Sequence, residues 1–346
     1  MRPWIPRRVL VTPSAAQWPH GAAIVDRAAA AGSEIIRLKA DRLTGLPDAY
    51  KDAKTTLAVV TASASRRRLQ PIPPSADWRF DLAEGCPAHC AYCYLAGSLA
   101  GPPIIRAYAN LPEILDTLPP AVGGGTVTSA SADRAGEGTT FECSCYTDPL
   151  AIEHLTGSLA ACITRFGEWN APVQLRFTTK FDAVTPLLGL RHAGRTRIRF
   201  SVNATAAERH EGGAPRMQAR LAALRAVAAA GYPVGLTVAP IIRLPEWADA
   251  YDRLFADVRH ALDGLPGVDL TAELITHRFT PKSKDILAGW YPGSALEMDE
   301  AQRARKFTKF GSVKYVFPRD EMTAMRATIE ASLARHLPAA RLLYWT

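Results

Sequence analysis

Short β-branched and aromatic runs alternate with amphipathic helical patterns after residue 77, and this alternation constrains the fold more than any other feature. The six predicted strands are residues 78–82, 140–145, 173–178, 197–202, 234–239 and 271–275. Helical patterns lie between them at residues 111–118, 152–166, 183–190, 216–230 and 247–261. Repeated strand–helix units favour a parallel sheet with helical crossovers. We therefore predict an α/β fold, a partial (β/α)6 TIM-like barrel with its active site at the carboxyl ends of the strands.

Smaller parts are predicted on either side of the barrel, which is assigned to residues 77–300. Before it, β-rich runs at 8–12 and 55–61, a helical stretch at 22–31 and an apolar segment at 34–38 indicate a small N-terminal α/β element, residues 1–76, packed on the barrel. After it, residues 306–316 have the alternation and central glycine of a β-hairpin. Residues 301–346 are therefore expected to form a C-terminal hairpin and helix. The Gly-rich stretch 121–138 is predicted to be a long, mobile loop.

Composition and charge indicate the class of protein and of partner. Hydrophobic residues make up 48% of the 346 residues and charged residues 21%, which is ordinary for a soluble globular protein. Lys and Arg number 41 against 33 Asp and Glu, and the net charge of +8 favours a polyanionic partner. Basic residues gather at 66–68, 191–199 and 303–314, and aromatic residues interleave with the last group. That mixture suits phosphates and unstacked bases, although any single basic run could be a solvated surface.

The cellular compartment is predicted from what the sequence lacks. No apolar run approaches the length of a membrane span, and the first residues lack the apolar region of a secretory signal. Six cysteines in a chain of this length fit a reducing compartment better than a disulfide framework. We therefore expect a cytoplasmic protein without a membrane partner.

Three cysteines follow the first predicted barrel strand with the spacing CxxxCxxC, at Cys86, Cys90 and Cys93. A structural zinc site requires four closed ligands, and this loop offers three. Three thiolates can hold a [4Fe-4S] cluster and leave one iron open to a substrate or cofactor. The spacing therefore predicts a reactive iron–sulfur site, unless Cys143 or Cys162 supplies a fourth ligand.

Polar side chains recur where the predicted strands end, at the rim that the cysteine loop is expected to share. They are Cys145, Thr147, Asp148, Thr179, Lys180, Ser201, Asn203, His277 and Arg278, with the pair Ala239-Pro240 at the end of a further strand. Ser, Asn and Asp commonly begin turns, which would explain any one of them. A lysine, an aspartate, an asparagine and a thiol at one rim fit a ligand site better.

Several sequence blocks, in order along nearly the whole chain, carry a family resemblance. They include GCPAHCAYCYL at 85–95, FECSCYTD at 141–148, LRFTTK at 175–180, RFSVN at 199–203 and ELITHRFT at 273–280. In these blocks the chain resembles the spore photoproduct lyases, radical S-adenosylmethionine (SAM) enzymes that repair the thymine lesion 5-thyminyl-5,6-dihydrothymine in DNA. The cysteine spacing alone would indicate only the radical SAM superfamily.

The resemblance implies roles for the cofactor-binding residues. Cys86, Cys90 and Cys93 would bind three irons of a [4Fe-4S] cluster, and SAM would occupy the fourth and yield a 5′-deoxyadenosyl radical. Lys180 would pair with the SAM carboxylate. The other positions expected near SAM are Thr147, Asp148, Ser201, Asn203 and Ala239. An external one-electron reductant of the flavodoxin or ferredoxin type is expected, and the protein is expected to act as a monomer.

The resemblance also implies a path for hydrogen atoms. The adenosyl radical would take hydrogen from C6 of the damaged thymine, and Cys145 would give a hydrogen atom to the thymine radical left after the bridge breaks. Tyr92 and Tyr94 would then pass hydrogen back to regenerate SAM; without the resemblance, packing over the cluster would be the simpler role for both rings. Damaged DNA is the expected partner. The residues expected to face it are His277, Arg278, Lys309, Phe310 and Lys314.

Alternatives remain open for one residue and for the substrate. Cys143 lies two residues before Cys145 on the same face of the strand, and it is either a buried core thiol, which we expect, or an auxiliary hydrogen donor or oxidation partner. The substrate could instead be another pyrimidine lesion or a modified RNA base. A cluster-containing nucleic-acid binding protein without enzymatic activity is the third possibility.

Overall fold

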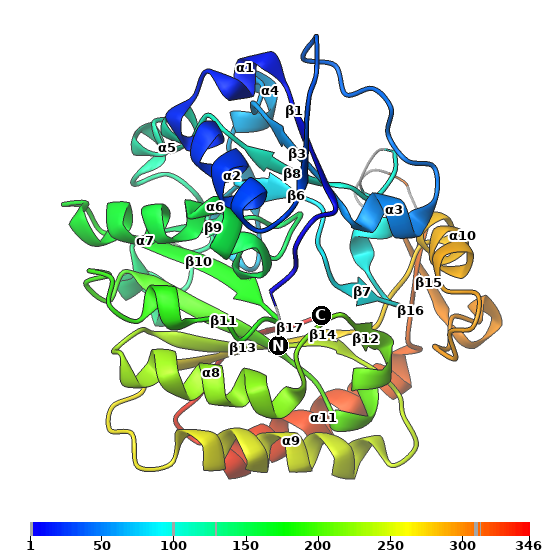
Figure 1. The fold of residues 1–346 in the computed structure, drawn as a ribbon. Helices are drawn as coiled ribbons and strands as arrows, with labels where there is room; N and C mark the ends of the chain where they lie inside the picture. Colours follow the sequence, from blue (N-terminus) through cyan, green and yellow to red (C-terminus); the bar gives the residue numbers. More distant parts are fainter. Residues whose placement is uncertain (1–2, 99–100, 129, 308–310, 312) are drawn as a thin grey trace. The chain divides into compact units, whose positions relative to one another are not determined.

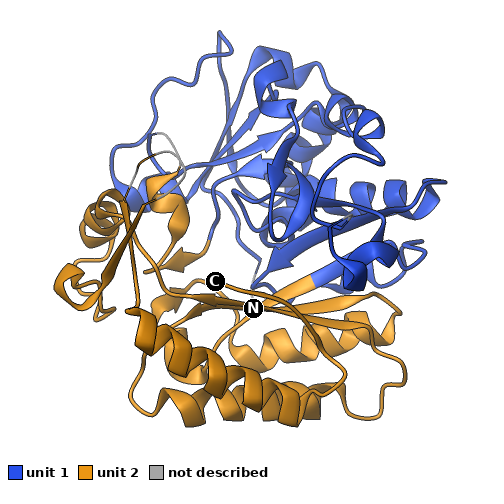
Figure 2. Cartoon of the chain, turned by 180° about the vertical axis from the view of Figure 1, so that it is seen from behind, with its two compact units in different colours: residues 1–87, 99–198 blue, residues 88–98, 199–346 orange. Residues whose placement is uncertain are grey.

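The computed structural model describes residues 3–98, 101–128, 130–307, 311 and 313–346. The chain divides into two compact units, shown in different colours in Figure 2. Unit 1 comprises Met1–Pro87 and Leu99–Ile198, and unit 2 comprises Ala88–Ser98 and Arg199–Thr346. The cysteine loop is shared, because Cys86 belongs to unit 1 whereas Cys90 and Cys93 belong to unit 2.

The N-terminal part of unit 1 is a five-stranded sheet in the order β2-β1-β3-β8-β6. Its strands are β1 (Arg8–Val11), β2 (Glu34–Arg37), β3 (Thr56–Val60), β6 (Ala83–Glu84) and β8 (Ile105–Tyr108). Strands β1, β2, β3 and β8 are parallel, and β6 pairs antiparallel with β8. Helix α2 (Pro19–Ala30) packs buried Ile24 and Ala28 against this sheet, beside Val9 and Leu57. The predicted N-terminal strands are therefore confirmed, and the sheet also recruits strands from beyond residue 76.

The second sheet has eight strands in the order β17-β14-β13-β11-β10-β9-β5-β4. The bounds are β4 (Gln70–Ile72), β5 (Ala76–Phe80), β9 (Thr139–Cys143), β10 (Val173–Thr179), β11 (Thr196–Val202), β13 (Val234–Ile241), β14 (Leu270–Thr276) and β17 (Arg341–Trp345). The pairs β5–β9, β9–β10, β13–β14 and β14–β17 are parallel. All six predicted strands are present, and the fold is the expected partial barrel of the TIM type (Figure 1).

The crossover helices are largely those predicted: α5 (Leu111–Leu115), α6 (Glu153–Thr156), α7 (Ser158–Glu168), α8 (Met217–Ala229) and α9 (Trp247–Leu262). The predicted helix 152–166 is interrupted at Gly157, whose φ of 65° ends α6. The predicted helix 183–190 is wrong, since only a 3-10 turn forms there, Thr185–Leu187. Pro186 within that turn lacks the N–H that a helix interior would need.

The segment predicted to be a mobile loop, residues 121–138, is anchored in the part that the structure describes. The buried Asp77 carboxylate accepts hydrogen bonds from the main-chain N–H of Val127 at 2.8 Å and from the Thr128 hydroxyl at 2.7 Å. The same carboxylate accepts from Thr140 N–H and Oγ1 at 2.9 and 2.8 Å. A 3-10 helix, Ala132–Glu137, follows. The carboxylate thus fastens this segment to β9.

The C-terminal part of unit 2 contains the predicted hairpin and helix. Strands β15 (Ala304–Phe307) and β16 (Val313–Val316) pair antiparallel, with Lys306 opposite Lys314, and α11 (Arg319–His336) follows. For this part of the chain, the sequence did not predict β17 or α10 (Pro281–Trp290), which begins with a capping box at Thr280 and Ser283. Among the described residues, no helix is long and apolar enough to cross a membrane.

Candidate active site

The first part of the cysteine loop, in unit 1, is held by three hydrogen bonds. Gly85 N–H donates to Tyr146 O at 2.8 Å, the Thr147 hydroxyl donates to Gly85 O, and the Lys54 ammonium donates to Cys86 O. Gly85 has a φ of 80°, and a Cβ there would collide with Ile104 O. The position therefore requires glycine, and Cys86 leaves β6 from a fixed turn.

The second part of the loop, in unit 2, is built on a short antiparallel ladder. Strand β7 (His89–Cys90) pairs with β12 (Glu211–Gly212), and Ala91 N–H donates to His210 O at 2.8 Å. Cys93 N–H then donates to Cys90 O at 3.1 Å, a tight turn that keeps these two cysteines close together. Cys90 is buried and Cys93 is half-buried.

The donor chemistry of the loop suits an iron–sulfur cluster. None of the six cysteines, all within the described ranges, forms a disulfide. Three thiols from one loop form the soft ligand set that such clusters require. The described residues contain no preformed group of three or more His, Cys, Asp or Glu side chains spaced for a metal ion.

Tyr92 is connected to a buried ion pair in unit 2. Its hydroxyl donates to the Glu211 carboxylate, which also pairs with the Arg220 guanidinium, and the Glu211 and Arg220 side chains are 0% exposed. Arg220 donates further to Ser201 O at 3.0 Å and Pro215 O at 2.9 Å. Burial and the Glu211 charge raise the pKa of Tyr92 well above its usual range. The phenol is thus neutral and fixed in direction.

Tyr94 has a different environment from Tyr92, although only one residue separates them. It begins the 3-10 turn Tyr94–Gly97, and it is 64% exposed. The predicted hydrogen transfer through Tyr92 and Tyr94 would therefore involve one fixed, half-buried ring, that of Tyr92, and one exposed ring, that of Tyr94.

Cys145 follows β9 on a sharp turn in unit 1. The preceding Ser144 has a φ of 62°, in the left-handed region that few non-glycine residues adopt. Its hydroxyl oxygen accepts from Leu82 N–H at 3.2 Å, which holds this conformation. Cys145 is half-buried after the turn, whereas Cys143 is 1% exposed. Burial raises the pKa of the Cys143 thiol well above its usual range, in agreement with the expected core role.

Asp148 is a buried carboxylate at the ends of β9 and β10. It accepts hydrogen bonds from the Thr179 hydroxyl and from Lys180 N–H, both at 2.7 Å. The Lys180 side chain is half-buried. The contacts of Asp148 show it fixing the main chain that carries Lys180, rather than lying open to a ligand.

The corresponding residues of unit 2 are Ser201, Asn203 and Ala239. The Ser201 hydroxyl donates to Ala239 O at 3.4 Å, and Asn203 Nδ2 donates to Pro240 O at 2.8 Å. Asn203 Oδ1 accepts from Ala204 N–H at 2.9 Å and from Tyr251 OH at 2.8 Å, and the residue is 0% exposed. Asn203 therefore fixes the main chain at the end of β13. Its side-chain hydrogen bonds given above are all made within the protein.

The predicted nucleic-acid contacts divide into buried and exposed residues. His277 is 2% exposed, and burial beside Arg303 lowers its pKa to about 3, so the imidazole is neutral. Arg303 donates to His277 O at 3.1 Å and stacks 3.8 Å from the Phe317 ring centre. Arg278 is exposed and Lys314 half-buried, whereas Lys309 and Phe310 lie outside the described residues. Lys306 is opposite Lys314 in the hairpin, and the Phe279–Tyr315 bridge brings the neighbouring Arg278 to the same strand. Burial lowers the pKa of Lys314, as do the charges of Arg278 and Lys306.

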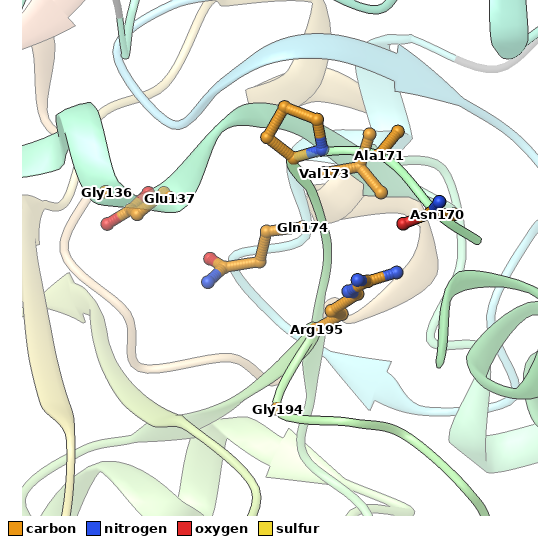
Figure 3. A pocket seen from close by; sticks show the side chains of 9 residues that line it. Gly136, Glu137, Asn170, Ala171, Val173, Gln174, Gly194 and Arg195 are labelled. Carbon is orange, nitrogen blue, oxygen red and sulfur yellow. The ribbon is translucent and has the colours of Figure 1, made fainter. Parts of the chain in front are cut away.

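A cavity of about 420 Å³ in unit 1 lies away from the predicted site (Figure 3). Its lining residues include Glu137, Gln174 and Arg195, which lie just before or at the beginning of β9, β10 and β11. Cys145, Asp148 and Lys180 instead follow the carboxyl ends of β9 and β10. Barrel active sites lie at carboxyl ends, so this cavity is not the candidate site.

Comparison with known proteins identifies the family. The family model for spore photoproduct lyase matches residues 4–346. The chain belongs to the spore photoproduct lyase family. The spore photoproduct lyase of Geobacillus sp. (strain Y412MC61) is 37% identical over 355 residues, covering 100% of both chains. The Bacillus subtilis (strain 168) enzyme is 35% identical, with 99% of each chain covered.

Solved structures of spore photoproduct lyase have the same fold as this chain. A double mutant with bound AdoMet and dinucleoside spore photoproduct has a TM-score of 0.91 and 35% identity, with 100% of both chains covered. A complex with dinucleoside spore photoproduct gives the same values. The resemblance seen in the sequence blocks is therefore confirmed over the full length.

Three residues of the site were missed by sequence reasoning: Glu211, Arg220 and Lys54. Glu211 lies 119 residues from Tyr92, and Lys54 lies 32 residues from Cys86. No local spacing connects such pairs. Only Arg220 carried a compositional signal, since it lies among the apolar residues that α8 buries, such as Leu221 and Leu224.

Asp148 leads to a pH-dependent prediction, because burial raises its pKa from 3.8 to about 6. The native state then binds this proton more tightly than the unfolded chain does. The stability that it contributes is full below about pH 4 and is lost as the pH rises through about 6. We expect the unfolding free energy of the wild type, relative to Asp148→Asn, to fall by about 2 kcal/mol between pH 4 and 7.

Urea unfolding at pH 4, 5, 6 and 7 would measure this difference. Leu155→Ala provides the control, because it removes buried side-chain volume and no ionisable group, so its cost in unfolding free energy should not vary with pH. A wild-type minus Asp148→Asn difference that is flat with pH would contradict the assignment.

Proposed function

We propose that this chain is a radical SAM DNA repair lyase that reverses the spore photoproduct to two thymines. The observation that carries the proposal is the full-length match to spore photoproduct lyases, among them a structure with AdoMet and the dinucleoside lesion bound. The chain has the three-cysteine loop, a cysteine on a sharp turn after β9, and a lysine at the end of β10. These are the groups that a radical carbon–carbon lyase needs to bind its cofactors and to complete the reaction.

Cys86, Cys90 and Cys93 would hold the [4Fe-4S] cluster. When bound, the cluster and SAM supply a carbon-centred radical that can take hydrogen from C6 of the lesion. Lys180 would pair with the SAM carboxylate, since a half-buried ammonium makes a strong charge-assisted hydrogen bond. Asp148 would support that contact by fixing the Lys180 main chain, and Ser201 would act similarly at Ala239. Asn203 and Thr147 would hold the surrounding main chain.

Cys145 would donate the hydrogen atom that converts the thymine radical to thymine. The sharp turn at Ser144 brings this half-buried thiol out of the sheet, unlike Cys143, which stays in the core. Tyr92 and Tyr94 would return hydrogen to the cofactor, with Tyr92 fixed by Glu211. An external reductant of the flavodoxin or ferredoxin type would supply the electron, and we propose that the protein acts as a monomer.

Replacing Cys145 by alanine is expected to separate SAM cleavage from repair. The radical would still form and open the lesion, but without its hydrogen donor the thymine radical would give abnormal adducts. Chromatography of dinucleotide products alongside 5′-deoxyadenosine would measure both. Cys143→Ala is the matched control and should keep thymine as the product. An unchanged product distribution in Cys145→Ala would remove the donor role.

Basic side chains of unit 2 support a nucleic-acid substrate, as does the family. Exposed Arg278 and Lys306 with half-buried Lys314 form a basic group suited to phosphates, and Phe307 is 67% exposed beside them. His277 would support this surface through Arg303. Lys309 and Phe310, which lie outside the described residues, stay predicted contacts. A duplex hides C6 of the lesion, so the damaged bases would have to leave the stack.

A substrate panel would test the proposed lesion against the alternative of another pyrimidine lesion or a modified RNA base. Reduced, reconstituted protein would be incubated anaerobically with SAM and, separately, the spore-photoproduct dinucleotide, a cyclobutane dimer and an RNA oligonucleotide. Thymine formation from the first substrate alone is expected. Turnover of the cyclobutane dimer or the RNA oligonucleotide, without turnover of the spore-photoproduct dinucleotide, would contradict the proposed lesion.

A further inference from the structure

Lys54 is a buried cation in contact with the cysteine loop. It is the last residue of α3 (Tyr50–Lys54) and is 7% exposed. Its ammonium donates a hydrogen bond to the main-chain oxygen of the predicted ligand Cys86. Trp4 Nε1 donates to Lys54 O at 3.2 Å and fixes the end of the helix. All three residues belong to unit 1, so the contact lies within one compact body.

The loop does not depend on Lys54 alone for its shape. Neutral groups hold the preceding residue, because Gly85 N–H donates to Tyr146 O and the Thr147 hydroxyl donates to Gly85 O. Gly85 is further confined by the close approach of Ile104. What Lys54 adds to these contacts is a positive charge at a cysteine ligand.

The Lys54 ammonium lies within hydrogen-bond reach of the main chain of Cys86, so its charge would act on the cluster at short range. A cluster with three thiolate ligands is anionic, and one-electron reduction adds one more negative charge. A nearby cation therefore stabilises the reduced cluster more than the oxidised one. Hydrogen bonds and charges around the ligands are among the recognised determinants of cluster potentials.

We propose that Lys54 raises the reduction potential of the cluster and so makes it easier to reduce before SAM is cleaved. The inference rests on the proposed function, because it requires the cluster at Cys86, Cys90 and Cys93. Lys54 is a positioning residue that acts through its charge. Its ammonium contacts the main chain of the predicted iron ligand Cys86 and would not touch the substrate.

A redox titration of the reconstituted, substrate-free protein, followed by the cluster EPR signal, tests the proposal. Lys54→Gln keeps a hydrogen-bond donor without the charge, Lys54→Arg keeps the charge, and Lys54→Met removes both. We expect Lys54→Gln and Lys54→Met to lower the reduced-to-oxidised ratio at a fixed potential about tenfold, a shift of about 59 mV to more negative values for one electron. Lys54→Arg should remain close to wild type.

Lys51 provides the matched control, because it is an exposed lysine of the same helix. Lys51→Met removes one positive charge from the protein and should leave the potential unchanged. If Lys54→Met does not fold, as judged by circular dichroism, the comparison of Lys54→Gln with Lys54→Arg decides. A wild-type potential in Lys54→Gln, or an equal shift in Lys51→Met, would overturn the inference. A wild type that binds no cluster would instead refute the proposed function itself.

Discussion

Replacing Cys90 by alanine is expected to abolish SAM cleavage while leaving the protein folded. The main chain of Cys90 pairs with Glu211 in the β7–β12 ladder, and alanine preserves that pairing. The side chain supplies one of three proposed iron ligands, so its loss leaves too few thiolates to retain the cluster. Iron content after anaerobic reconstitution and 5′-deoxyadenosine formation should both fall to background.

Cys162→Ala is the control for this experiment. Cys162 is a fully buried thiol of α7, and burial raises its pKa above the usual range, as expected of a core residue. Its replacement should lower stability slightly and leave iron content unchanged. Full iron content and SAM cleavage in Cys90→Ala would show that the loop is not the cluster site.

Replacing Glu211 by alanine is expected to lower the free energy of unfolding by about 3–5 kcal/mol. The side chains of Glu211 and Arg220 are both 0% exposed, so the substitution leaves a guanidinium buried without its counter-charge. The Tyr92 hydroxyl loses its acceptor in the same step. Equilibrium urea denaturation monitored by circular dichroism would measure the change.

The exposed pair Arg326–Glu330 provides the comparison for Glu211. Its side chains are 56% and 31% exposed on one helix, and Glu330→Ala should cost only about 0.3–0.5 kcal/mol. A double variant, Glu211→Leu with Arg220→Leu, should recover part of the lost stability because no charge is then left unpaired. Equal losses from Glu211→Ala and Glu330→Ala would contradict the burial argument.

The barrel strands could be predicted from sequence because each is a short run that contains β-branched or aromatic residues and is bounded by turn residues. Strand β10, for example, is buried over most of its length and needs no information from distant residues. Strand β17 could not be found in this way, because all five of its residues are half-buried and buried positions do not alternate with exposed ones along it. Helix α10 did carry a signal, Thr280 followed by Pro281 and Ser283, which is a typical helix start.

The sequence predicted which residue types lie at the candidate site, but it did not predict the hydrogen bonds that they make. Polar residues at strand ends identified Asp148 and Asn203, but the structure shows both side chains holding main chain within the protein. The partners of Tyr92 and Cys86 come from distant segments, and a buried carboxylate or ammonium has no periodic pattern. The sequence therefore predicts which residues lie at the site, whereas the hydrogen-bond partners of those residues are seen only in the folded structure.

The most direct test of the account follows a hydrogen atom from the lesion. A spore-photoproduct dinucleotide deuterated at C6 of the damaged thymine would be incubated anaerobically with SAM and the reduced, reconstituted protein. We predict two thymines per lesion, only when SAM is present, with deuterium appearing in 5′-deoxyadenosine or in recovered SAM. Thymine release without SAM, or SAM cleavage with the lesion intact, would contradict the account.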